Sequence, residues 1–354
     1  MLPAAVQRRP TSHDVARLAG VSQPTVSRAL RDDPRVAPET RARVRAAAAK
    51  LGYVPSRRGR SLSTRVTGQI AVVVGDLGNP FYMEAIECLY AAIEELDRLM
   101  IVLADRPSRP VEIEHLLDGS NDGAILTTTL LSSELPRELS RRGLPFVLLN
   151  RVVDQPKVNA CVSENEAGAR AMIEELIALG HRDIGAILGP GDTSTSRDRE
   201  AGMRAALEAA GLELDEERVF RGSQFSYEVG YEGLQRLLEP DDGPVPTAIF
   251  CANDVIAIGA LNAARACGVA VPEDLTIVGF DDIAMASWDV FSLTTVRQDL
   301  PEMARRATRL LDELIADPGA RPQRITVPSR LVMRGSHGPP RSGPLRARRG
   351  KRAP

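Results

Sequence analysis

Apolar residues recur along this chain with two different periods, and the change of period divides it. In the first 66 residues they recur every three to four positions, which is typical of helices that bury one face. Three such stripes consist of Val15, Leu18 and Ala19; of Val26, Ala29 and Leu30; and of Val44, Ala48 and Leu51. Three short helices bury only a small core, so the pattern predicts a small all-α module.

The residues at the ends of these stripes predict where the helices begin and end. Gly20-Val21-Ser22 separates the first two stripes; Ser22 can cap the second helix, and Pro24 is tolerated in its first turn. Pro38 is expected to open the third helix, and Gly52 to end it. A short helix, a glycine turn and a capped second helix together predict a helix-turn-helix.

From residue 68 onward, apolar runs of strand length alternate with helical patterns. The runs are Ile70–Val74, Met100–Leu103, Ala124–Leu126, Phe146–Leu149, Ile184–Leu188, Ala248–Cys251 and Thr276–Val278. The helical patterns are Met83–Leu99, Glu166–Leu179, Arg199–Ala210, Tyr227–Leu238, Val255–Ala266 and Pro301–Ile315. This alternation predicts parallel sheets covered by helices. There are too many units for one sheet, so we expect two α/β subdomains with a ligand cleft at the carboxyl ends of their strands.

The net charge of −2 hides an uneven distribution. Residues 1–66 carry 14 basic and 4 acidic side chains, and residues 336–354 carry 6 basic and no acidic ones. The segment between them carries 25 basic and 43 acidic side chains. Charge runs are usually solvated faces, but a basic head on an acidic body indicates a polyanion partner for the head alone.

Two segments differ from the rest in composition. Residues 56–67 are rich in Ser, Arg and Gly, which predicts a linker. Residues 336–354 are rich in Pro, Gly and Arg with a single leucine, so we predict a disordered basic tail that buries too little apolar surface to order itself. The tail is either inert or adds non-specific affinity for DNA.

Composition and motifs argue against several classes of protein. No run approaches the roughly 20 apolar residues that cross a bilayer, and the first 15 residues lack the apolar segment of a secretion signal. The four cysteines are far apart, which argues against a zinc site and fits a reducing cytoplasm. The four histidines are scattered, and GxxxxGK[ST], HExxH, GxSxG and GxGxxG are absent. We expect a cytoplasmic protein with no metal, no cofactor, no membrane partner and no enzymatic activity.

In a helix-turn-helix the second helix enters the major groove, which places Gln23, Pro24 and Arg28 toward base edges. Gln pairs with adenine and Arg with guanine, whereas Pro24 reads a thymine methyl group or nothing. Short hydroxyl side chains that suit phosphate contacts are Thr11, Ser22, Thr25 and Ser27. The same pattern alone is also that of an ordinary helical hairpin, but the basic excess favours DNA.

The run from Ser56 to Leu62 holds three arginines and ends in an apolar side chain. Arg57 and Arg60 are candidate DNA contacts. Leu62 is a candidate wedge between base steps of the minor groove, in a segment that folds only on DNA. A plain tether is the alternative.

The segments DVARLAGVSQPTVSRAL, ETRARVRAAAAKLGYVPS and GRSL make this chain resemble the lactose/galactose repressor family of bacterial transcription regulators. Further matches extend the resemblance over about residues 11–336: NPFY, DGAIL, LLNR, GHRDIGAILG, RDREAG, PTAIFCANDVIAIGAL, VPEDLTIVGFDD, LTTVRQ and SRLVMRGS. Ala37 departs from the family's usual capping Ser, and Gly59 departs from its common Ala. Gly59 should make a hinge helix harder to form by about 0.5–1 kcal/mol.

The resemblance implies an α/β core of two parallel-sheet subdomains, periplasmic-binding-protein-like, with an all-α helix-turn-helix headpiece. The implied boundaries are 1–55 for the headpiece, 56–67 for a hinge helix, 68–335 for the core, about 68–165 plus 297–326 for its N-subdomain, and about 166–296 plus 327–335 for its C-subdomain. Homodimers of such proteins bind pseudo-palindromic double-stranded operators. No leucine heptad follows Ser336, so a dimer is the expected assembly.

The resemblance also implies an effector site in the cleft, at positions carried over by motif: Tyr82, Asn150, Arg151, Arg197, Arg199, Phe225, Asn253 and Asp281. Each residue alone has an ordinary explanation in core packing or capping. As a set they suit an aromatic face on a sugar ring, with amide, carboxylate and guanidinium groups fixing its hydroxyls. We therefore expect a sugar or sugar derivative, acting as inducer or corepressor; a purine-like or phosphorylated ligand stays open.

Two functions compete at this point. The first is a repressor controlled allosterically by that effector. The second is a solute-binding protein of a sugar transport system, which shares the core fold. The basic head and the absent signal peptide disfavour the second.

Overall fold

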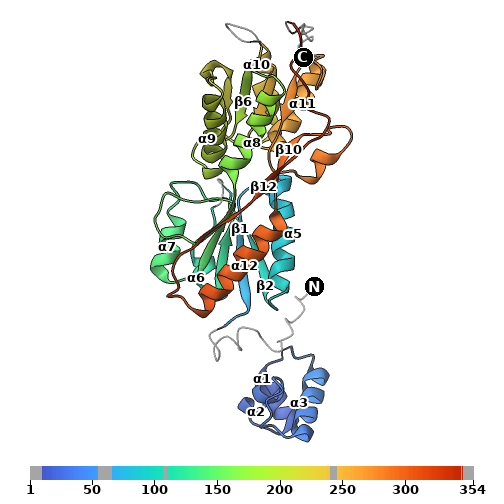
Figure 1. The fold of residues 1–354 in the computed structure, drawn as a ribbon. Helices are drawn as coiled ribbons and strands as arrows, with labels where there is room; N and C mark the ends of the chain where they lie inside the picture. Colours follow the sequence, from blue (N-terminus) through green and yellow to red (C-terminus); the bar gives the residue numbers. More distant parts are fainter. Residues whose placement is uncertain (1–9, 55–65, 107–109, 240–244, 344, 346–354) are drawn as a thin grey trace, which may run out of the picture. The chain divides into compact units, whose positions relative to one another are not determined.

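The computed structural model describes residues 10–54, 66–106, 110–239, 245–343 and 345. The chain forms two compact units, residues 1–67 and 68–354, and each is described by itself (Figure 1). Arg57, Arg60 and Leu62, the predicted hinge contacts, lie outside the described residues.

The first unit contains the three predicted helices, α1 (Ser12–Ala19), α2 (Gln23–Ala29) and α3 (Pro38–Leu51). Their core consists of Val15, Ala16, Ala19, Val26, Ala29, Val36, Val44, Ala47 and Ala48. The prediction that Leu18 joins this core is wrong, because Leu18 is 45 % exposed. Successive helical residues are about 100° apart, so Leu18 lies roughly 100° around α1 from the buried face that Val15, Ala16 and Ala19 form.

Capping side chains set the ends of these helices. Thr11 and Asp14 form a reciprocal capping box at the start of α1, and Gly20 ends that helix in the left-handed region, with φ 63°. The side chain of Ser22 caps α2, which confirms its predicted capping role. Gly20 and Ser22 therefore fix the two sides of the turn between α1 and α2. At the start of α3, by contrast, Ala37 offers no side-chain hydrogen bond.

The second unit contains two parallel sheets, which confirms the predicted α/β architecture (Figure 1). The first sheet has the order β11-β5-β4-β3-β1-β2, with β1 (Gln69–Val74), β2 (Leu99–Ala104), β3 (Gly123–Leu126), β4 (Phe146–Leu149), β5 (Ala160–Ser163) and β11 (Arg324–Val327). Its helices are α5 (Pro80–Glu94), α6 (Glu114–Leu117), α7 (Leu135–Arg142) and α12 (Leu300–Ala316). Ile70 and Val72 join one core cluster, and Ala71 and Val73 join another. Successive side chains of a strand point to opposite faces of the sheet. Because both sets of side chains are buried here, the sheet is covered on both faces.

The second sheet has four strands in the order β7-β6-β8-β9. They are β6 (Ile184–Leu188), β7 (Val219–Arg221), β8 (Ala248–Cys251) and β9 (Thr276–Val278). The helices of this subdomain are α8 (Asn165–Ala178), α9 (Ser194–Ala209), α10 (Tyr227–Leu238) and α11 (Asp254–Ala266), with two short 3₁₀ helices, η1 (Glu216–Arg218) and η2 (Ala284–Ser287). α8 packs on α9, and α10 packs on α11.

The chain passes between the two subdomains three times. The first passage runs from β5 to α8, and the second runs through β10 (Thr295–Gln298) to α12. The third runs from β11 to β12 (Ser329–Val332), which pairs antiparallel with β10 between the two sheets (Figure 1). Each subdomain is therefore built from segments that are far apart in the sequence.

The C-terminal segment packs on the second subdomain, so the prediction of a disordered tail is wrong for its described part. The Ser336 hydroxyl donates to the Ile277 carbonyl at 2.6 Å, and the Gly338 N–H donates to Thr276 Oγ1 at 3.0 Å. Arg341 donates to three backbone carbonyl oxygens that precede β8 and β9. Hydrogen bonds to strand ends fix this segment, whereas the composition argument considered only apolar burial.

Within the described ranges, no helix combines the length and the apolar character that a membrane span requires. The same ranges hold no group of three or more His, Cys, Asp or Glu side chains placed to bind a metal ion. All four cysteines are free thiols.

Candidate functional site

Polar side chains from the ends of several strands meet in one cavity of the second unit. Asn150 follows β4, Asn253 follows β8 and Asp281 follows β9, while Arg199 comes from the first turns of α9. The full lining is Asn79, Phe81, Tyr82, Asn150, Arg151, Thr195, Arg199, Phe225, Asn253 and Asp281. This lining includes every predicted effector residue except Arg197. Parallel strands place their carboxyl ends at the same edge, which explains why residues from both sheets converge here.

Three lining residues were not predicted. Asn79 and Phe81 belong to the NPFY segment, from which only Tyr82 was selected. Thr195 lies four residues before Arg199 on α9, hence on the same helix face. The spacing of four residues was the signal that could have identified Thr195.

Arg199 and Asp281 form a buried ion pair at the centre of the cavity. Arg199 Nη2 donates to Asp281 Oδ1 at 2.9 Å, Nε donates to Asn165 Oδ1 at 2.8 Å, and Nη1 donates to the Ala252 carbonyl at 2.6 Å. Burial raises the pKa of Asp281 and lowers the pKa of Arg199, and their direct hydrogen bond opposes both shifts. The pair thereby holds the start of α9 against the loop that follows β9.

Arg151, Tyr82 and Phe225 form the aromatic side of the cavity. Arg151 Nη2 donates to Tyr82 Oη at 2.8 Å, and its guanidinium carbon lies 5.6 Å from the centre of the Phe225 ring. Burial raises the pKa of Tyr82, so this phenol is neutral. The Phe225 ring packs so closely on Gly189 that a side chain there would overlap it. This arrangement supplies a flat apolar wall beside a cation.

Two amides in the cavity differ in what they offer a ligand. Asn253 Oδ1 accepts the Ile256 N–H at 3.0 Å and caps α11, while its NH₂ group is left to donate to a ligand. Asn150 sits in the left-handed region, with φ 68°, and its Oδ1 is buried without a partner within the described chain. A buried acceptor without a partner is costly, and a ligand hydroxyl would satisfy it.

The cavity is nearly filled by its own side chains. Its volume is about 10 Å³, which is close to the minimum for a single water molecule. A sugar-sized ligand requires the two subdomains to separate or the side chains to move. The structure therefore corresponds to a closed cleft.

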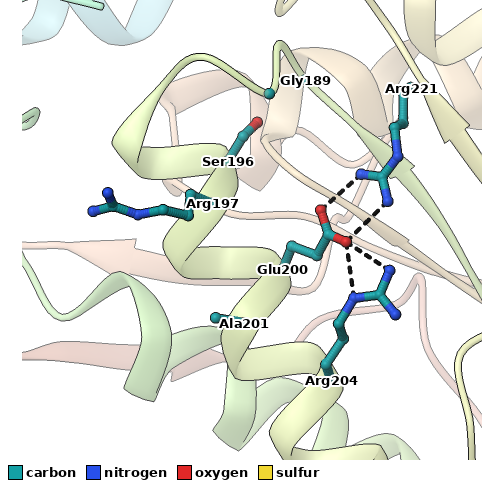
Figure 2. A pocket seen from close by; sticks show the side chains of 8 residues that line it. Gly189, Ser196, Arg197, Glu200, Ala201, Arg204 and Arg221 are labelled. Carbon is teal, nitrogen blue, oxygen red and sulfur yellow. Dashed lines mark hydrogen bonds and ion pairs between the residues drawn. The ribbon is translucent and has the colours of Figure 1, made fainter. Parts of the chain in front are cut away.

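Arg197 lies on another face of α9 and lines a second cavity of about 270 Å³ (Figure 2). It pairs with Asp198 at 2.9 Å and with Asp154 at 3.3 Å. Figure 2 shows Glu200 between Arg204 and Arg221, with Arg197 pointing away from this cluster. The charges in this second cavity are thus compensated by salt bridges.

The candidate DNA-contacting residues of the headpiece lie along α2 and at two helix caps. Ser22 caps α2; Gln23, Pro24 and Thr25 form its first turn; Ser27 and Arg28 lie near its end; and Thr11 caps α1. Ser22, Pro24 and Arg28 are exposed, and within the described headpiece the Arg28 side chain has no hydrogen bond or ion pair. A free guanidinium on an exposed helix is available to a base edge or a phosphate.

The other candidates in the headpiece already have intramolecular partners. Gln23 Nε2 donates to Ser12 Oγ at 3.3 Å, and Ser27 Oγ accepts from Arg31 at 2.9 Å. Thr25 Oγ1 lies 2.8 Å from Ser22 Oγ. These bonds are exposed or half-buried, so exchanging them for DNA contacts costs little.

A helix-turn-helix unit joined to a two-subdomain core of this type defines a DNA-binding transcriptional regulator. Residues 11–56 match the description "Bacterial regulatory proteins, lacI family", and residues 173–337 match a periplasmic binding protein-like domain. The chain is 36 % identical to the HTH-type transcriptional regulator CelR of Thermobifida fusca over 341 residues, which cover 93 % of this chain and 99 % of CelR.

Two solved structures are similar over nearly the whole chain. The lac repressor dimer bound to operator and the anti-inducer ONPF has a TM-score of 0.82 and 27 % identity, covering 94 % of this chain and 100 % of that one. The CelR–cellobiose complex has a TM-score of 0.70 and 33 % identity, covering 93 % and 100 %. The chain belongs to the lacI family of bacterial regulatory proteins. It is a regulator rather than an enzyme or a transport component.

Proposed function

We propose that this protein is a repressor whose affinity for operator DNA is set by a sugar or sugar derivative bound between the core subdomains. The observation that carries the proposal is the convergence of seven predicted residues, spread from Tyr82 to Asp281, on one cavity. The relative CelR is described in complex with cellobiose, which is a sugar. We place its site of action in the bacterial cytoplasm.

The cavity couples ligand binding to subdomain geometry. Tyr82 and Asn150 come from the first subdomain, and Arg199 and Asp281 come from the second. A ligand that bridges both groups binds one subdomain angle more tightly than another, so it shifts the population toward that angle. Residues 56–67, which connect the core to the headpiece, would pass this shift to the DNA.

We propose that the headpiece reads operator bases through Gln23, Pro24 and Arg28, with phosphate contacts from Thr11, Ser22, Thr25 and Ser27. Support comes from the exposed Arg28 and from the capped N-terminus of α2, which sets the approach of this helix. Arg57 and Arg60 would add contacts next to the minor groove.

We propose a homodimer on a pseudo-palindromic operator. Large apolar side chains are exposed on the core: Met83 and Tyr90 on α5, and Trp288 after η2, are 49 %, 52 % and 53 % exposed. Glu84 of α5 accepts the Ala284 N–H at 2.8 Å, which places the loop with Trp288 beside α5. Exposed apolar patches of this kind are typical of protein interfaces. The similar lac repressor structure is described as a dimer.

The substitution Asp281→Asn tests the effector site. It keeps the shape of the side chain but removes the charge that holds Arg199, so effector affinity should fall about tenfold or more. Operator affinity without effector should stay within about twofold. A thermal-shift screen of sugars identifies the effector, calorimetry gives its affinity, and a gel shift gives operator binding.

Arg197→Gln is the matched control, because Arg197 lies on α9 but outside the closed cleft. This variant should respond to the effector as the unmodified protein does. Unchanged effector affinity in Asp281→Asn would place the effector elsewhere. Absence of salt-sensitive binding to operator DNA would contradict the repressor function itself.

A further inference from the structure

Arg151 is a buried arginine without a direct ion pair, and Asp281 attracts it only at longer range. It is only 6 % exposed, yet its contacts are the Tyr82 hydroxyl and the face of Phe225, both of which are neutral. Its Nε is buried without an acceptor, and no carboxylate oxygen in the described chain lies within 4.0 Å of its guanidinium. Buried charges in proteins are normally paired, so this arrangement calls for a partner.

Other shielded arginines of the core show what Arg151 lacks. Arg98 and Arg199 each lie 2.9 Å from a carboxylate oxygen, of Asp122 and Asp281 respectively. Arg151 has the same need for charge compensation, but it faces into the cleft, where a ligand would sit.

The charged groups lining the cleft do not balance. They are Arg151, Arg199 and Asp281. Asp281 Oδ1 already accepts from Arg199 and, at 2.7 Å, from Gln298. Two guanidinium groups therefore share one carboxylate, and Arg151 is the one without direct contact to it.

We propose that the effector is an acidic sugar derivative, with a carboxylate or phosphate group that pairs with Arg151 while its hydroxyls meet Asn150, Asn253 and Asp281. This inference rests on the proposed function, because it assigns the chemistry of that same cleft. An oxyanion accepts from the free Nε and compensates the buried charge. The Phe225 face remains available to the apolar side of the sugar ring.

Matched pairs of ligands test this proposal on the full-length protein. The panel comprises D-glucose and D-galactose, their uronic acids and their 6-phosphates, each followed by thermal unfolding and then by calorimetry. At least one acidic member should stabilise the protein more than its neutral parent does. Added NaCl should weaken the binding of the acid and leave the neutral sugar nearly unaffected.

Two variants separate charge from shape at this position. Arg151→Gln should lower affinity for the acidic ligand about 10- to 100-fold and lower affinity for the neutral parent by a clearly smaller factor, so the preference for the acid is lost. Arg151→Lys keeps the charge and should retain the preference for the acid. Arg197→Gln, which removes an arginine outside the closed cleft, should change neither affinity.

The uronic acids and the phosphates distinguish the two sources of the oxyanion, since only one set should give the larger effect. If no acid binds more tightly than its neutral parent, or if Arg151→Gln binds the acid as well as the original protein, the inference is overturned. In that event, neutral sugars that still bind and lose affinity in Asp281→Asn would leave the proposed function intact. If nothing in the panel changes stability or operator binding, this inference fails, and the wider sugar screen together with the gel shift decides the proposed function.

Discussion

His181 connects the C-terminal segment to the second subdomain through both nitrogens of its ring. It is fully buried, with Nε2 2.9 Å from the Gly338 carbonyl and Nδ1 2.8 Å from Thr247 Oγ1. A carbonyl oxygen can only accept, so Nε2 carries the proton and donates to Gly338. The Thr247 hydroxyl also donates to the Asp183 carbonyl, at 3.1 Å. The ring is shielded from solvent, so a second proton would place a charge where water cannot solvate it.

This geometry predicts a loss of stability in acid. Burial lowers the pKa of His181 below its ordinary value of 6.5. Below pH 6.5 the unfolded chain therefore takes up a proton more readily than the folded chain does, so stability is complete above that pH and declines as the pH falls. In thermal unfolding between pH 7.5 and 5.5, His181→Gln should lose less Tm than the original protein, by a few degrees.

His115→Gln is the control for that experiment, since the side chain of His115 is 61 % exposed. Its unfolding curve should follow the original protein at every pH. Parallel pH curves for the original protein and His181→Gln would show that the histidine does not couple the tail to folding.

At the scale of single residues, the sequence predicted seven of the ten residues that line the cleft but not the contacts they make there. Asn253 was identified by motif, but its role as the cap of α11 appears only when Ile256 is placed beside it. Arg197 and Arg199 looked alike in sequence. They lie two positions apart on α9 and so on different faces of it, which is why Arg197 points away from the cleft. The isolation of Arg151 could not be predicted, because it depends on which carboxylates other segments bring near.

Helix packing in the second subdomain depends on glycines that allow backbones to touch. A Cβ at Gly230 of α10 would overlap the Ile256 carbonyl of α11, and a Cβ at Gly259 of α11 would overlap the Tyr227 carbonyl of α10. Both obstacles are backbone atoms, which cannot rotate away. The two helices must therefore separate if either glycine gains a side chain.

Gly230→Ala should destabilise the core by about 3 kcal/mol, at the upper end of the usual cost of overpacking. Gly191→Ala should cost less than about 1 kcal/mol, since nothing lies within 4 Å of a Cβ there. Urea unfolding followed by circular dichroism measures both variants. Equal midpoints would mean that α10 and α11 can separate freely.

At the scale of elements, long periodic segments were predicted well and short ones were missed. The pattern over Met83–Leu99 merged α5 with the start of β2, because apolar Leu99 continues the helical stripe although the helix ends at Glu94. β5 and β11 were not predicted. Each has four residues and is completed by pairing with the other across about 160 positions of sequence. Local pattern cannot report such pairing.

At the scale of the whole molecule, the proposed function makes the link between headpiece and core the place where regulation would act. Leu62→Ala should weaken specific operator binding about tenfold or more and reduce DNA bending, because the apolar wedge is lost. Binding to random DNA should be nearly unchanged, since it depends on phosphate charge. Gel-shift titrations and circular-permutation bending assays measure these effects.

Leu18→Ala is the matched control, because it truncates an exposed leucine of the headpiece. It should leave specific and random binding unchanged. If Leu62→Ala instead lost affinity equally on specific and random DNA, the wedge assignment would be wrong.

The sequence by itself determined the helix-turn-helix, the two-sheet core, the family and seven of the ten positions that line the cleft. These follow from local periodicity, capping residues and motifs, which are properties of neighbouring residues. Only the tertiary structure decided that Arg199 pairs with Asp281, that Arg151 has no acid beside it, that the cleft is closed and that the tail is docked. Pairing and burial are relations between distant segments, so they exist only once the chain has folded.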